Sequence, residues 1–201
     1  MIHEDDFYKH DKDIPIDEQY NIQNWDSPEA LDFDTFEKEL DIICRTGKIA
    51  SKLTHNDNVD NLSKFNLSDD FSSTIKQRYE SINGDLTIVL VDGFMLFNNP
   101  KISSKFDIKL LIRSPYQVLK DRRAARPGYQ TLDSFWKDPP YYFDEFVYKS
   151  YVDSHSFLFK DGNVEGKLDL TIGAGVIDYM NYENPIEASI SWVCDQILKA
   201  V

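Results

Sequence analysis

The chain has 201 residues, 41% of them hydrophobic and 13% aromatic, which is enough for one α/β domain with a substantial core. Its net charge of -13 argues against a nucleic-acid or anionic-membrane surface spread over the whole protein, so any phosphate-binding site must be local. Cys44 and Cys194 are too few for a disulfide framework, and the chain shows neither a signal peptide nor a long apolar run. We therefore expect a cytoplasmic protein without a membrane partner.

Residues 2–9 form a charged cluster close to the first methionine. If Ile2 and His3 end a strand, Asp5 and Asp6 lie at its carboxyl end, where open α/β sheets bind ligands. Adjacent carboxylates at that edge could supply a general base and a metal ligand. A solvated amino terminus explains the same residues, and spacing alone does not choose between the two interpretations.

The stretch around Trp25 has the residues of a helix start. Asp26 is in the capping position, Pro28 is in the first turn, and Glu29 completes a capping box; Gly47 supplies the stop. The alternative is that Trp25 offers a ring face, and Asp26 a carboxylate, to a ligand at the helix entrance. The sequence leaves both interpretations open.

An unbroken apolar run, Ile88–Val91, predicts a strand buried on both faces of a parallel sheet. A helix from Ser68 or Asp69 to Ile82 precedes it. Asp92 follows the strand directly and is a site candidate because it lies at the carboxyl end. A simple strand-to-loop cap is the alternative role for Asp92.

The remaining elements continue the alternation of helices and strands, which indicates a parallel sheet. The expected elements are a strand over 106–112, a helix opening at Pro115, a helix over 138–159, a strand over 168–172 and a terminal helix over 185–201.

Residues 120–126 carry four cations in seven positions, in contrast to the acidic chain around them. Arg122 and Arg126 are four apart and should share a helix face, while Arg123 should point elsewhere. The following Pro127 and Gly128 permit a hinge. This pattern suits a phosphate-clamping lid, and the alternative is a solvated helix face with internal ion pairs.

Six motifs occur in one order along the chain, and the match of which they are part covers nearly its whole length. They are His3–Lys9, Tyr20–Leu31, Val91–Asn98, Arg122–Arg126, Gly128–Thr131 and Pro139–Asp144. Together they resemble the nicotinamide riboside kinases. The resemblance implies a P-loop kinase-like three-layer α/β fold with a parallel sheet, similar to the uridine kinases. It also implies ATP- and Mg2+-dependent phosphorylation of the ribose 5'-hydroxyl of nicotinamide riboside, a step in NAD biosynthesis, with uridine or cytidine as alternative substrates.

The resemblance assigns roles at the reacting end of the site. Asp5 matches the catalytic base, which also lies at the magnesium ion, and Asp92 matches an acidic residue near that metal. Arg122 and Arg126 match lid arginines on the ATP phosphates, in a lid at about 120–140.

The resemblance also assigns a nucleoside pocket. The matching substrate-binding residues are Asp5, Asp6, Phe7, Tyr8, Trp25, Asp26, Arg123, Tyr129 and Gln130. In this assignment the Asp26 carboxylate reaches the ribose hydroxyls, and Tyr129 and Gln130 close over the nucleoside.

The chain departs from the family in one respect. It contains no Gly-x-x-x-x-Gly-Lys-Ser/Thr loop, and Gly47, Lys48 and Ile49 at a helix end are no substitute. We therefore expect a single amino-terminally truncated kinase-like domain over 1–201, without its first strand, P-loop and first helix. Impaired activity should follow, as should a gap between the strand ending at Val91 and the strand over 106–112. A non-catalytic nucleoside-binding or regulatory relic is the alternative.

Overall fold

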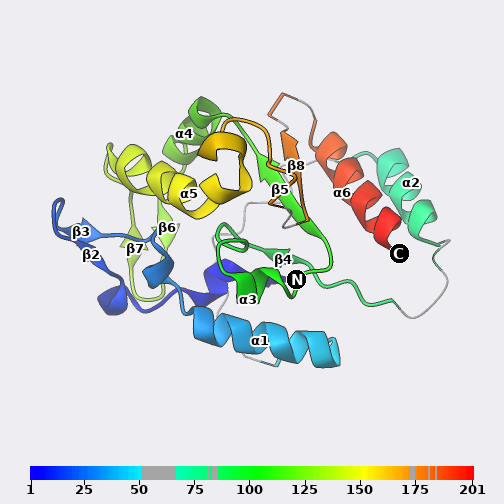
Figure 1. Ribbon diagram of the computed structural model, residues 1–201, viewed down its shortest axis with the longest axis horizontal. Helices are drawn as coiled ribbons and strands as arrows, with labels where there is room; N and C mark the ends of the chain where they lie inside the picture. The colour runs from blue at the N-terminus through cyan, green and yellow to red at the C-terminus, as the bar shows by residue number, and fades with distance from the viewer. Residues whose placement is uncertain (51–66, 81, 83–85, 173–174, 181, 184) are drawn as a thin grey trace.

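The structure is a computed structural model that describes residues 1–50, 67–80, 82, 86–172, 175–180, 182–183 and 185–201 (Figure 1). Two pairs of parallel strands form its α/β framework. β1 (Ile2–His3) pairs with β4 (Val91–Asp92), with His3 opposite Asp92. β5 (Lys109–Arg113) pairs with β8 (Val176–Met180) over five residues. Among the described residues no ladder joins β4 to β5, so the strands form two separate half-sheets.

The prediction that Ile88–Val91 is a strand buried on both faces is wrong. Only Val91 and Asp92 form a ladder, and Ile88 and Leu90 are 44% and 49% exposed. Val89 and Val91 pack on the core beside β1, so the segment buries alternate residues. An apolar run does not by itself show that both faces are covered, because the covering element must come from elsewhere in the fold.

α1 (Phe33–Thr46) covers the β1–β4 pair from below in Figure 1. It buries Phe36 and Leu40 against Ile2 of β1. The expected Asp26 cap is wrong. Pro28–Ala30 forms a separate 3-10 turn, and the Asp32 carboxylate accepts a hydrogen bond from the Thr35 amide at 3.0 Å.

α2 (Asp69–Glu80) and α6 (Ile186–Ala200) lie side by side at one end of the molecule (Figure 1). The Ser68 hydroxyl caps α2 by accepting the Phe71 amide at 3.2 Å, which confirms the predicted start. Arg78 of α2 forms an ion pair with Asp195 of α6. The apolar side chains of α6 are only partly covered, because no residue of this helix is fully buried.

The strand predicted over 168–172 is wrong. Leu168 forms one bridge to Phe159, and the Asp169 carboxylate then accepts hydrogen bonds from Thr171 that close a turn. Leu170 is 80% exposed. The strand of this region is β8, where Asp178 forms an ion pair with the buried Arg113 of β5. Composition favoured 168–172, but the side-chain hydrogen bonds of Asp169 end the extended conformation there.

The other elements surround the ends of the strands. The helical ones are α3 (Pro100–Ser103), α4 (Tyr116–Ala124), a π-helical turn (Phe143–Val147) that leads into α5 (Tyr148–His155), and 3-10 turns at Glu4–Phe7, Asp11–Asp13, Ser156–Leu158 and Lys160–Gly162. Two small hairpins complete the fold: β2 (Ile16–Asp17) with β3 (Ile22–Gln23), and β6 (Tyr129–Gln130) with β7 (Phe135–Trp136).

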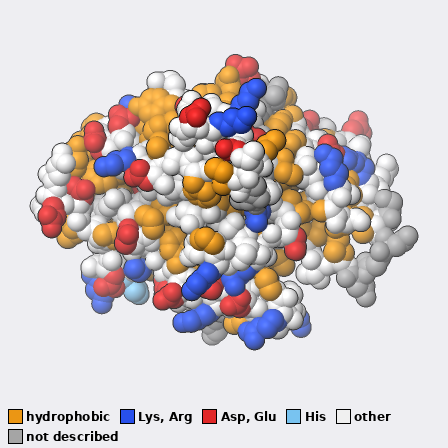
Figure 2. Space-filling view, in the orientation of Figure 1, with side chains coloured by type: hydrophobic (Ala, Val, Ile, Leu, Met, Phe, Trp, Pro, Cys, Tyr) orange, Lys and Arg blue, Asp and Glu red, His pale blue; other side chains and the backbone are white. Residues whose placement is uncertain are grey.

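Charges of both signs are interspersed on the surface. In Figure 2 the Lys, Arg, Asp and Glu side chains alternate along the lower edge, where α1 lies in Figure 1. In the described part of the chain, no helix combines the length and the apolar character that crossing a membrane requires.

Candidate active site

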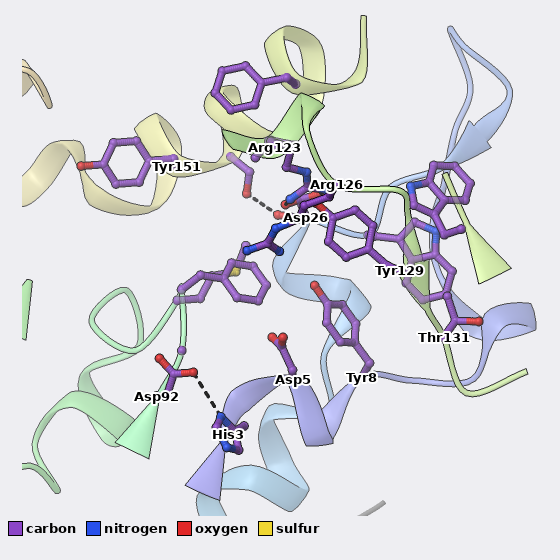
Figure 3. A pocket seen from close by; sticks show the side chains of 18 of the residues that line it. His3, Asp5, Tyr8, Asp26, Asp92, Arg123, Arg126, Tyr129, Thr131 and Tyr151 are labelled. Carbon is purple, nitrogen blue, oxygen red and sulfur yellow. Dashed lines mark hydrogen bonds and ion pairs between the residues drawn. The ribbon is translucent and has the colours of Figure 1, made fainter. Parts of the chain in front are cut away.

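A cavity of about 770 Å³ lies where β1 and β4 end. Residues from both strands, α4, the β6–β7 hairpin and α5 line it. In Figure 3, Asp5 and Tyr8 point into this space from the β1 side, and Tyr129 faces them. The cavity therefore occupies the position at which parallel α/β sheets bind ligands.

Two carboxylates lie at the strand end of the cavity. Asp5 directly follows β1, and Asp92 ends β4, where its Oδ2 lies 3.1 Å from Nδ1 of His3. Burial raises the pKa of Asp5 to about 6, and the negative charge of Asp92 adds to that shift. A carboxyl group with a raised pKa in a cavity is suited to accept a proton near neutral pH.

Glu4 fixes the loop that follows Asp92. Its side chain is fully buried, and its Oε2 accepts the amide hydrogens of Phe94 at 2.7 Å and Met95 at 2.9 Å. The pKa of Glu4 is raised to about 7, because the effect of burial is larger than the opposing effect of these hydrogen bonds. A Cβ on Gly93 would lie 2.5 Å from Oε2 of Glu4, so this approach requires glycine.

A buried ion-pair network lies on the other side of the cavity. Nη1 and Nη2 of Arg123 each lie 3.2 Å from one oxygen of Asp26, whose exposed fraction is 6%. Nε of Arg123 donates to Asp138 at 2.6 Å. Burial raises the pKa of Asp26 although Arg123 opposes the shift. Burial lowers the pKa of Arg123, but Asp26 and Asp138 together raise it further, so the guanidinium stays charged.

Aromatic rings line the cavity between these two charged ends. Tyr8 stacks with Phe94 at 6.2 Å between ring centroids and meets Trp25 edge-on at 5.9 Å. Trp25 in turn lies 6.0 Å from Trp136. The Arg123 guanidinium lies 4.8 Å from the Tyr129 ring centroid. Apolar faces beside fixed charges suit a flat ring that carries a polar or cationic group.

Two further arginines line the cavity. Nη1 of Arg122 lies 3.3 Å from the Ser114 hydroxyl, and the Arg126 guanidinium lies 5.5 Å from the Tyr129 ring centroid. α4 ends at Ala124, so Arg126 lies just beyond the helix and does not share a helical face with Arg122, contrary to the prediction from spacing. Both side chains nevertheless reach the same cavity.

Curated proteins of known activity match this chain over almost all of its length, whereas no family model matches it. A nicotinamide riboside kinase of Saccharomyces cerevisiae is 59% identical over 202 residues, which cover 99% of this chain and 84% of that protein. Relatives with the same description from Eremothecium gossypii and Schizosaccharomyces pombe are 48% and 36% identical, each over 100% of this chain and over 80% and 85% of their own length. The chain belongs to the nicotinamide riboside kinase family.

The fold of this kinase brings most of the predicted site residues into one cavity. Those that line it are Asp5, Asp6, Tyr8, Trp25, Asp26, Asp92, Arg122, Arg123, Arg126, Tyr129 and Gln130. Phe7 is the exception. It is 5% exposed and packs on Phe36 of α1, with 4.7 Å between the ring centroids, so it belongs to the core.

Several residues that shape the site of the kinase are not among those predicted from the sequence. Glu4 is one of them, and its signal in the sequence is the Asp92–Gly93 pair, because a glycine there allows another group to approach closely. Asp138 and Trp136 precede the Pro139–Pro140 pair, and the indole Nε1 of Trp136 donates to Asp138 at 2.8 Å. No spacing rule connects Asp138 to Arg123, because the two residues meet only in the folded chain.

Proposed function

We propose that this kinase transfers a phosphoryl group from ATP to the ribose 5'-hydroxyl of nicotinamide riboside, as a step of NAD biosynthesis. The names of the curated relatives support the substrate. The observation that carries the proposal is the two-ended cavity. It holds a carboxyl group with a raised pKa at the strand end and a buried Asp26–Arg123 pair among aromatic rings at the other.

The nucleoside occupies the aromatic end in this proposal. Asp26 and Arg123 are fixed against each other, so their free hydrogen-bonding capacity can hold the ribose hydroxyls. Tyr8, Trp25 and Tyr129 offer ring faces to the base. Nicotinamide riboside carries a cationic pyridinium ring, which favours aromatic faces and nearby carboxylates over bulk water.

Asp5 accepts the proton of the attacking hydroxyl in this proposal. Its burial and its raised pKa fit a general base, and the adjacent strand end fixes its position. Arg122 and Arg126 would face the phosphates of ATP, where their charge stabilises the developing negative charge.

The carboxylates of Asp5 and Asp92 fit a magnesium ion. Burial raises the pKa of Asp5, and the negative charge of Asp92 at the same strand end adds to that shift. Carboxylate oxygens are the ligands that magnesium prefers. Magnesium bound there would neutralise phosphate charge during transfer.

We further propose a P-loop kinase-like three-layer fold in which another strand fits between β4 and β5. Two observations support this proposal: no ladder joins these strands among the residues that the structure describes, and Ile112 on β5 is 56% exposed. These 201 residues contain no Gly-x-x-x-x-Gly-Lys-Ser/Thr loop. We therefore expect slow phosphoryl transfer by this chain alone, because backbone amides and a lysine that cradle phosphates supply much of that catalysis.

A second candidate function is nucleoside binding without turnover. The observation that favours it is a fully assembled nucleoside side next to a sequence without a P-loop. In this case Asp26, Arg123 and the rings would still hold nicotinamide riboside, but no phosphate would be transferred.

Titration calorimetry and a phosphorylation assay separate these proposals. The 201-residue chain should bind nicotinamide riboside in preference to uridine. Placing a strand, a Gly-x-x-x-x-Gly-Lys-Ser/Thr loop and a helix ahead of Met1 should raise ATP-dependent turnover. Binding without turnover in both proteins would support the second candidate, and a clear preference for uridine would overturn the substrate assignment.

The role of Asp5 has a separate test in the protein with the added loop. Asp5→Asn should lower kcat by about 100-fold or more, because the amide cannot accept the hydroxyl proton. Asp13→Asn, in an exposed turn, is the matched control and should leave kcat unchanged. Near-normal turnover by Asp5→Asn would remove Asp5 from the role of base.

A further inference from the structure

The β6–β7 hairpin forms one wall of the cavity although it is very small. Each of its strands has two residues, and an isolated hairpin of that size is not stable in water. It nevertheless contributes Tyr129, Gln130, Thr131 and Trp136 to the cavity lining. Contacts from another part of the chain must therefore hold it in place.

Trp136 packs on Trp25 and donates to Asp138, and Asp11 attaches the tip of the hairpin from a 3-10 turn more than a hundred residues earlier in the sequence. Oδ2 of Asp11 accepts the hydroxyl of Thr131 at 2.9 Å and the hydroxyl of Ser134 at 2.5 Å. Its Oδ1 accepts the amide of Asp133 at 3.3 Å. One carboxylate thus receives three donors from the tip of the hairpin.

The attachment is reciprocal. Oδ2 of Asp133 accepts the amide of Asp11 at 2.9 Å, and Nδ1 of His10 lies 3.2 Å from each oxygen of Asp133. Each turn therefore binds the other through a carboxylate and a backbone amide, which fixes both position and orientation.

The other end of the hairpin reaches the substrate side. Tyr129 contacts Arg123, which pairs with Asp26. Gly128 brings the strands close together, since a Cβ there would lie 2.4 Å from the Phe135 ring. A change in the hairpin's position would therefore be transmitted to the ring of Tyr129 and to Arg123.

We propose that Asp11, which lies outside the cavity lining, is a positioning residue that holds the β6–β7 hairpin against the nucleoside and so sets nucleoside affinity. The inference rests on the proposed function for the identity of the ligand. In this arrangement the hairpin is a fixed wall of the cavity, although it lies within the lid predicted at about 120–140. Without the attachment, the hairpin would have to become ordered when the nucleoside binds, and the loss of conformational freedom would lower the affinity.

Asp11→Ala should weaken nicotinamide riboside binding in calorimetry by about 10-fold, equivalent to about 1.4 kcal/mol. It should also speed hydrogen exchange in residues 129–136 while leaving exchange in α1 and the melting temperature nearly unchanged. Asp11→Asn keeps one acceptor oxygen, so its affinity and its exchange rates should lie between those of Asp11→Ala and those of the unchanged chain. Asp13→Ala, in the same turn, is the matched control and should resemble the unchanged chain.

Unchanged hydrogen exchange in Asp11→Ala would overturn the attachment, and faster exchange with unchanged affinity would overturn the positioning role. If the unchanged chain binds no nicotinamide riboside, the proposed function fails, whereas the exchange comparison still decides the attachment. Should Asp11→Ala fail to fold, Ser134→Ala removes one donor from the hairpin side and should give a smaller effect in the same direction.

Discussion

Arg123 connects the two carboxylates, Asp26 and Asp138, on one side of the cavity. It donates to Asp26 with both terminal nitrogens and to Asp138 with Nε. A planar guanidinium can make these contacts together, and a lysine ammonium cannot. Since Asp26 is buried, removing the arginine would leave its charge uncompensated, which costs more than the pair itself contributes.

Arg123→Gln should lower the free energy of unfolding by about 3 kcal/mol, the lower end of the range for breaking a buried pair. Asp26→Asn should also destabilise the chain, and the double variant should cost less than the sum of the two. Urea unfolding of the four proteins measures this coupling. Additive effects would show that the two side chains do not interact energetically.

The start of α1 shows how an element differs from its local sequence signal. The stretch from Asp26 to Glu29 has the residues of a capping box, but burial of Asp26 against Arg123 removes its carboxylate from the helix end. Asp32 takes that position, and hydrogen bonds from Thr35 lower its pKa although burial opposes the shift.

Asp32→Ala should therefore destabilise the protein by about 1 kcal/mol, the usual value of a helix cap. Its pKa is lowered in the folded state, so this contribution is present above the unfolded pKa and is lost as the pH falls through the folded one. Asp34→Ala, in the first turn of the same helix, is the control. Equal losses of stability in thermal unfolding would contradict the capping role of Asp32.

At the scale of the whole molecule, the two half-sheets leave apolar strand edges and faces in contact with solvent. Ile88 and Leu90, which precede β4, and Ile112 of β5 are 44%, 49% and 56% exposed, and in the described part of the chain no ladder joins β4 to β5. Unpaired backbone beside apolar side chains is a template for pairing between molecules.

Leu90→Lys should therefore raise the soluble concentration of the 201-residue chain and slow its aggregation in light scattering, because an edge lysine opposes strand pairing. Leu170→Lys is the control, since Leu170 is 80% exposed in a turn and belongs to no strand. If both variants raise the soluble concentration equally, the added surface charge alone would explain the effect.

His155 makes the stability of the folded chain depend on pH. It is 3% exposed, and burial lowers its pKa although the hydrogen bond to the Tyr151 carbonyl opposes the shift. Between the lowered pKa and the unfolded value of about 6.5, the unfolded chain binds more protons. This contribution to stability is therefore present above about pH 6.5 and is lost as the pH falls toward the folded pKa.

His155→Gln should reduce the difference in unfolding free energy between pH 7.5 and pH 5.5, measured by urea unfolding. The slope from one such histidine cannot exceed about 1.4 kcal/mol per pH unit. If His155→Gln shows the same difference in unfolding free energy between the two pH values, other groups cause the loss of stability in acid.

The sequence by itself determined the α/β class, the stop of α1 at Gly47, the start of α2 at Ser68 and most of the residues that line the cavity. These follow from local rules and from several motifs in a fixed order, and both are written along the chain. The tertiary structure decided which carboxylate caps α1, where the last strand lies, and that Glu4, Asp11 and Asp138 shape the site. The hydrogen bonds that join Glu4 to Phe94, Asp11 to Ser134 and Asp138 to Arg123 connect residues 15 to 123 positions apart. The Asp32 cap is local, but it forms where Arg123 pairs with the competing Asp26. Burial and long-range pairing depend on how the whole chain packs, so no local pattern could predict them.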